Sequence, residues 1–193
     1  MRNYKVEKFA ADITVDEYIS GFRDETRFME LCKQCPNYGK SWGCPPFDFN
    51  TEYFLRQYEY AHLMAARITP AENDIPIGQT QEFIRPERFR IEKELLEMER
   101  LYKGRAFAYI GRCLHCNDAV CTRQCNKPCL HPDKVRPSLE AFGFDIERTL
   151  AELFRIKLLW GENGKLPEYL VLVSGFFHND EGFYQFNLNG KKV

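Results

Sequence analysis

The sequence predicts an α/β fold, in which a small layered sheet with flanking helices carries two cysteine-rich loop insertions. Two observations predict it. Segments with the pattern of buried strands alternate along the chain with segments of helical periodicity, as expected for elements packed in layers. All eight cysteines lie in two loop-like stretches between those segments. With 193 residues, 44% of them hydrophobic, the chain is expected to form one domain over residues 1–193.

Three short apolar runs are the expected strands. Residues 61–68 end at a Thr-Pro pair, residues 106–110 follow a glycine, and residues 169–173 lead into a Ser-Gly pair. Residues 182–188 are expected to add an edge strand. The first 28 residues carry mixed helix and strand signals, with a short helix expected over 16–22.

The clearest helix is expected over residues 86–102, where Phe89, Leu95 and Tyr102 share an apolar face and Gly104 follows the end. Two further helices are expected. One covers residues 50–60, with Asn50 or Thr51 as its N-cap, and the other covers residues 146–159 after Asp145.

Charge and hydropathy exclude several classes of partner. The 27 basic and 28 acidic residues leave a net charge of -1, which gives no reason to expect a nucleic acid. The longest apolar run, residues 169–177, is too short to span a membrane. The start of the chain lacks the apolar core of a signal peptide, so a reducing cytoplasm is the expected location. Cysteines kept reduced there favour a metal over disulfides.

The spacing of the cysteines points to metal binding. The first group, in the loop over 31–49, is Cys32-x2-Cys35-x8-Cys44 followed by Pro45-Pro46. The second group, in the loop over 112–137, is Cys113-x2-Cys116-x4-Cys121-x3-Cys125-x3-Cys129. A Cys-x2-Cys pair directs two thiolates, and nearby backbone N–H groups, toward one centre. All eight cysteines are therefore candidate ligands, and the domain is expected to be a metal-binding one.

Two kinds of metal centre fit these cysteines. A zinc site needs four ligands and would leave half of the thiols unused. The dense run of the second group is closer to the ligation of iron–sulfur clusters, and a four-iron cluster is favoured. One cluster would use Cys113, Cys116, Cys129 and either Cys121 or Cys125. Two clusters would need the first group to borrow a thiolate from the second, either Cys121 or Cys125, and the sequence leaves both arrangements open.

Four sequence motifs stand out in the two loops: CKQCPNYGKSWGCPP at 32–46, CLHC at 113–116, CLHP at 129–132 and RPSLEAFG at 136–143. In these motifs the chain resembles the Domain of Unknown Function 2284 family of predicted metal-binding proteins. The resemblance implies metal binding, with an iron–sulfur cluster expected. The sequence departs from the family pattern between Cys116 and Cys129, where two cysteines occur, so the third ligand of this loop stays open.

Other polar residues in or near the loops are candidates for a role at the metal centre, and several of them have a simpler interpretation. His115, inside a Cys-x2-Cys pair, either tunes the centre or is merely exposed. Arg112, Arg123, Lys127 and Arg136 are either counter-charges for a negative cluster or solvated loop charges. Ser138 is expected to cap a helix that has Glu140 in its first turn. His178 would be functional if it followed a strand of a parallel sheet.

Electron transfer, or a redox accessory role toward a partner enzyme, is the expected function. One alternative is a cluster-dependent reductase acting on a small molecule or a corrinoid, for which an iron left open by the three cysteines of the first group would be needed. The other is a structural zinc module. The sequence does not decide whether the protein is an enzyme, nor its oligomeric state.

Overall fold

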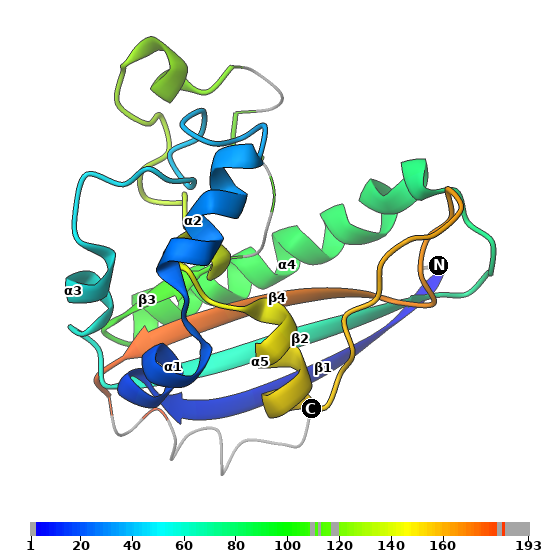
Figure 1. Ribbon diagram of the computed structural model, residues 1–193, viewed down its shortest axis with the longest axis horizontal. Coiled ribbons are helices and arrows are strands. Elements are labelled where there is room, and N and C mark those ends of the chain that lie inside the picture. The colour runs from blue at the N-terminus through cyan, green and yellow to red at the C-terminus, as the bar shows by residue number, and fades with distance from the viewer. Residues whose placement is uncertain (1–2, 109–110, 112, 117–119, 181–182, 184–193) are drawn as a thin grey trace.

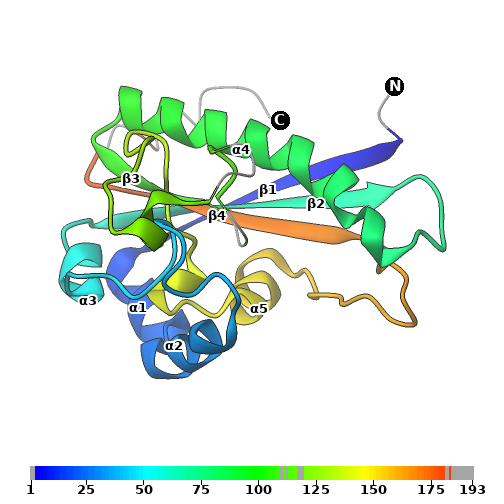
Figure 2. The same ribbon diagram turned by 90° about the horizontal axis from the view of Figure 1, so that it is seen from above.

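The structure, a computed structural model, describes residues 3–108, 111, 113–116, 120–180 and 183. It confirms the predicted mixed α/β class, because one four-stranded sheet has helices packed on both of its faces (Figures 1 and 2). The predicted edge strand over 182–188 falls almost wholly outside the described residues. No helix in the described ranges combines the length and the apolar character needed to cross a membrane.

All neighbouring strands of the sheet are antiparallel and follow the order β1-β2-β4-β3. The strands are β1 (Tyr4–Thr14), β2 (Tyr60–Pro70), β3 (Gly104–Phe107) and β4 (Leu170–His178). β2 contains its predicted run over 61–68, β4 begins one residue into the run over 169–173, and β3 overlaps only the start of the run over 106–110. The sequence did not predict β1 as a strand, because charged residues occupy its outer positions. Its side chains alternate between more buried and exposed positions, as in a strand with one covered face. His178 was expected to be functional if it followed a strand of a parallel sheet. That condition is not met, because β4 pairs antiparallel with both β2 and β3.

The sheet is covered on both faces because each strand directs alternate side chains to opposite sides. Helix α4 (Thr80–Leu101) covers one face and buries Ile91 and Leu95 against the strands (Figure 2). Helix α1 (Val15–Phe22) lies on the other face, where Tyr18 stacks on Phe144 with ring centroids 4.2 Å apart. Burial of such aromatic side chains is the main force holding the layers together.

Two helices differ in length from the prediction. α4 begins at Thr80 rather than at residue 86, so Pro86 lies inside it, where packing of the apolar face outweighs the missing N–H. The predicted helix over 146–159 is shorter: α5 (Ile146–Thr149) passes into a π-helical turn, Leu150–Phe154. Arg155 then reverses the chain with a φ of 58°, and this ends the helix.

Helix α2 (Glu25–Gln34) is fixed in place by a short 3₁₀ turn, Glu140–Phe142. The Asp24 N–H donates to the Gly143 carbonyl at 2.8 Å, just after that turn. Gly143 has a φ of 88°, and a Cβ there would lie 2.7 Å from the Cα of Glu25, so only glycine fits. The turn therefore holds the start of α2, and the helix carries the first cysteines at its other end.

A short helix, α3 (Thr51–Leu55), leads from the first cysteine loop into β2. Asn50 caps it as predicted, since its side chain accepts a hydrogen bond from the Tyr53 N–H at 2.7 Å. The helix is shorter than the predicted span of 50–60, because the chain turns at residues 56–58 and enters β2 at Tyr60.

Candidate metal centre

The two cysteine-rich loops form one body, which we call the cysteine head: residues 31–49 together with the described part of 112–137. Figure 1 shows the loops side by side, projecting from the sheet beyond the end of α2. Hydrogen bonds from side chains of one loop to side chains and backbone carbonyls of the other join the two loops. The Trp42 indole N–H donates to the Thr122 hydroxyl oxygen at 3.2 Å, and Arg123 contacts the first loop at three carbonyls.

Arg123 is the main link between the loops. Its guanidinium donates to the Ser41 carbonyl oxygen at 2.7 Å, and also to the carbonyl oxygens of Cys44 and Pro46. The same group lies over the Trp42 ring, 5.4 Å from its centroid. Because its planar donors satisfy the backbone on both sides of Cys44, Arg123 fixes the position of that cysteine relative to the second loop.

Helix α4 holds the second loop from the side of the sheet. The His115 imidazole Nε2 lies 2.6 Å from a Glu92 carboxylate oxygen, and both side chains are largely buried. Farther along the loop, Arg136 pairs with Glu99, with its Nε donating at 2.7 Å. The His115 imidazole is therefore paired and largely buried rather than merely exposed, and a tuning role toward the centre stays a prediction.

The first group of cysteines converges at the end of α2. Cys32 lies in its last turns, Cys35 caps its C-terminus, and Cys44 follows in the loop that Arg123 holds. Burial raises the pKa of Cys32, and the neighbouring charges of Cys35, Cys44 and Glu140 raise it further. These three thiols are thus neighbours, with the Glu140 carboxyl beside them.

The second group gathers around Cys113. Burial raises the pKa of the Cys113 thiol, the His115 backbone N–H lowers it, and the nearby Cys116, Cys129 and Cys121 raise it again. Cys121 also acts on Cys44, whose pKa is raised chiefly by burial. Cys121 therefore lies where the two groups meet, and the thiols with raised pKa values must lose protons before they can bind a metal.

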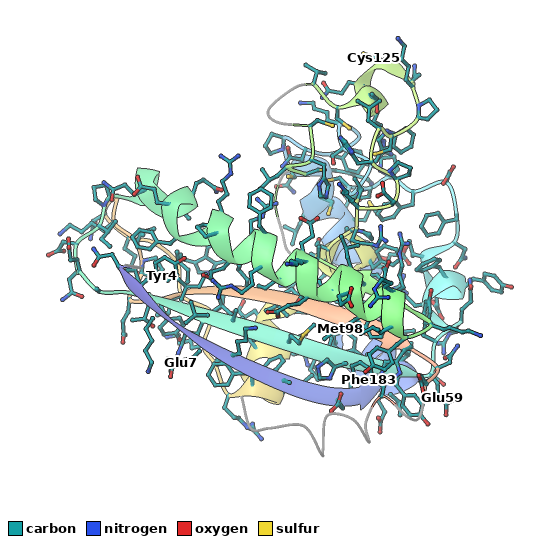
Figure 3. The ribbon with its side chains drawn as sticks, turned by 180° about the vertical axis from the view of Figure 1, so that it is seen from behind. Tyr4, Glu7, Glu59, Met98, Cys125 and Phe183 are labelled. Carbon is teal, nitrogen blue, oxygen red and sulfur yellow. The ribbon has the colours of Figure 1, made fainter. Side chains whose placement is uncertain are left out.

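Cys125 differs from the other seven cysteines in its position. It ends the 3₁₀ turn Thr122–Cys125, and Figure 3 places it at the outer tip of the head; it is exposed, as Cys35 also is. The sequence left Cys121 and Cys125 as equal alternatives, and the structure brings Cys121, not Cys125, to the junction of the groups. Among the described residues, no three Cys, His, Asp or Glu side chains are close enough to bind a single metal ion.

Hydrogen-bond donors point at several of the sulfurs. The His131 backbone N–H lies 3.4 Å from the Cys129 Sγ. The His115 backbone N–H contacts Cys113, and the Ser41 hydroxyl contacts Cys44. Donors of this kind stabilise the charge of a thiolate and tune a metal bound to it. The donor set of the head thus fits a thiolate-bound metal group.

A cavity of about 180 Å³ lies between the loops and α4. The thiols of Cys32, Cys35 and Cys44 line it from one loop, and Cys113 lines it from the other. Acidic and basic side chains line the rest, among them Glu140, Glu92 and Arg88. The cavity therefore has the first cysteine group on one side and a wall of charged side chains on the other.

Sequence reasoning did not identify the carboxyl groups of that wall. Glu140 was assigned to the first turn of a helix, and the Ala141 N–H does donate to the Ser138 hydroxyl at 3.2 Å, as expected of a cap. Part of the Glu140 side chain reaches the surface, but its Oε1 does not. Burial raises the pKa of this carboxyl to about 7. In the sequence, only its place in the RPSLEAFG motif at 136–143 could have marked Glu140 as a site residue.

The remaining predicted polar residues have mixed outcomes. Arg123 and Arg136 bind within the protein rather than being solvated. Lys127 is exposed, and Arg112 lies outside the described residues. His178 is fully buried at the end of β4, and the Asp180 N–H donates to its Nδ1 at 3.3 Å.

Replacing Arg123 with alanine is expected to separate the loops and to reduce the metal content of the purified protein by more than half. The carbonyls on both sides of Cys44 would lose their donor, so that thiol would no longer be held beside Cys121. Metal analysis after anaerobic purification checks this. Lys127→Ala, which removes an exposed cation from the same loop, is the control, and equal losses in the two variants would contradict the proposed link.

Comparison with known proteins gives one match. No curated protein matches the chain, and no solved structure does. A family model, described as predicted metal-binding protein, matches residues 19–174 and so includes both cysteine loops and all the elements between them. The chain therefore belongs to the Domain of Unknown Function 2284 family of predicted metal-binding proteins.

Proposed function

We propose that the cysteine head holds iron–sulfur clusters of the four-iron type, and that the protein transfers single electrons to or from a partner enzyme. The observation that carries this proposal is the grouping of the thiols. Cys113 has three cysteine neighbours, which make a set of four, while Cys32, Cys35 and Cys44 form a second set beside it. Four thiolates are the usual ligands of such a cluster, which supplies a one-electron couple when bound.

The number of the thiols supports a cluster over one zinc ion. A zinc site takes four ligands and would leave half of the eight cysteines unused. The thiols fall into two groups, and cluster ligation uses both of them.

The surface of the head supports docking of a redox partner. Val120 and Leu130 of the second loop are each 67% exposed, and Trp42 of the first loop, which donates to Thr122, is 39% exposed. Apolar side chains on an otherwise polar loop are typical of sites where another protein binds. A partner that docked there would lie next to the thiols, as electron transfer requires.

Analysis of iron, acid-labile sulfide and zinc in anaerobically purified protein tests this proposal. We expect iron and sulfide in equal amounts, about four of each per cluster, and a brown colour that fades on reduction with dithionite. Zinc without sulfide would contradict the cluster, and a cluster that dithionite does not reduce would contradict electron transfer.

A further inference from the structure

The first cysteine group has one thiolate too few for a complete cluster. Cys32, Cys35 and Cys44 supply three ligands. Cys121 of the other loop acts on both Cys113 and Cys44, but assigning it to the first group would leave Cys113, Cys116 and Cys129 one ligand short instead. Cys125 is exposed at the tip of the head (Figure 3). A cluster held by the first group therefore needs a ligand of another kind.

Glu140 lies where that ligand is needed. The 3₁₀ turn that contains it packs beside α2, and its charge acts on Cys32. Glu140 lines the same 180 Å³ cavity as Cys32, Cys35 and Cys44. The turn that carries Glu140 is held against the start of α2 by the close fit of Gly143 against Glu25.

One oxygen of the Glu140 carboxyl has nothing to bind. Oε1 is inaccessible to solvent and has no hydrogen-bond partner among the described residues. The groups that act favourably on this carboxyl are the Ser138 hydroxyl and the backbone N–H of Glu140 itself, and neither is a cation. An ionised carboxylate buried in this way is costly unless a positive charge is supplied, and a metal supplies one.

We propose that the Glu140 carboxylate is the fourth protein ligand of the metal site formed by Cys32, Cys35 and Cys44. This inference rests on the proposed function. Oxygen from a carboxylate is a harder donor than a thiolate, so the iron bound to it differs from the three others and is held less firmly. The head then contains two unlike clusters, one with four cysteines and one with three cysteines and a glutamate.

Mössbauer spectra of protein reconstituted with ⁵⁷Fe test the ligand directly. We expect one iron with oxygen coordination in the wild type, distinct from the sulfur-bound irons. In Glu140→Cys, which supplies a thiolate at the same position, that distinct iron is expected to become sulfur-bound. Glu147→Gln, an exposed glutamate on α5, is the control and is expected to keep the wild-type spectrum.

Glu140→Gln gives a second measurement, because the neutral amide has nearly the same shape as the carboxylate. On titration with ferricyanide, the variant is expected to lose one iron in four from the first cluster at a lower dose than the wild type. In that step [4Fe–4S]²⁺ releases one Fe²⁺, gives one electron to ferricyanide and leaves [3Fe–4S]⁺, which electron paramagnetic resonance detects.

The outcomes separate this inference from the function on which it rests. Two clusters in the wild type, with spectra and ferricyanide doses unchanged in both Glu140 variants, would overturn the role of Glu140 and leave the clusters in place. Zinc without sulfide would overturn the clusters instead. In that case cobalt substitution decides about Glu140, because a visible Co²⁺ spectrum that is identical in wild type and Glu140→Gln would overturn the ligand as well.

Discussion

Cys113→Ala is expected to remove about half of the iron and sulfide and to lower the melting temperature of the protein. Cys113 is the cysteine around which Cys116, Cys121 and Cys129 gather, so in the proposed cluster the remaining three thiolates would leave one iron without a cysteine ligand. Because free energy of metal binding is also free energy of folding, loss of the cluster destabilises the head. Iron and sulfide analysis, with a circular dichroism melt, checks both effects.

Cys125→Ala is the matched control for this variant. It removes a thiol from the same loop, but one that is exposed at the tip of the head. Its iron content and melting temperature are expected to stay at the wild-type values. Full iron in Cys113→Ala, or an equal loss in both variants, would show that the assignment of ligands in the second loop is wrong.

Glu140→Gln is expected to change how the stability of the metal-free protein depends on pH. In the wild type, burial raises the pKa of Glu140 from 4.5 to about 7. The folded state then binds more protons than the unfolded state between those values, so stability is greatest below pH 4.5 and is lost as the pH rises through 7. The loss is about 3 kcal/mol, and the variant lacks it.

Urea unfolding of both metal-free proteins between pH 4 and pH 8 measures this effect. The difference between the two proteins is the useful quantity, because burial lowers the pKa of His178 and gives the opposite slope near pH 6 in both. The stability of Glu140→Gln relative to the wild type is expected to rise by about 3 kcal/mol across the range. Parallel curves would mean that the carboxyl is not buried in solution.

The parts of the fold that depend on local sequence were predictable. The runs that became β2 and β4, the apolar face of α4 and the caps at Asn50 and Asp145 are all set by nearby residues. The direction of the strands was not, since pairing of β2 with β4 joins residues about a hundred positions apart. The same holds for Pro86, which lies inside α4 only because the sheet packs against that helix.

The candidate site divides in the same way. The spacing of the cysteines indicated a metal from sequence alone, because two thiols in a Cys-x2-Cys pair must lie close together. The sequence could not show that Cys121, rather than Cys125, lies at the junction of the two groups. That depends on the position of Cys44, which Arg123 holds from the other loop. Glu140 resembled an ordinary first-turn glutamate, and only its contact with α2 distinguishes it.

The link through Arg123 sets an order of events during synthesis of the protein. The first cysteine loop leaves the ribosome well before Arg123, and the whole of β2, α4 and β3 is made between them. Until that later segment arrives, the carbonyls of Cys44 and Pro46 lack the Arg123 donor. Delivery of the metal group to a finished, folded chain is therefore expected. A nascent chain that ends before residue 121 would expose the thiols of the first loop, and no metal group is expected to bind them stably.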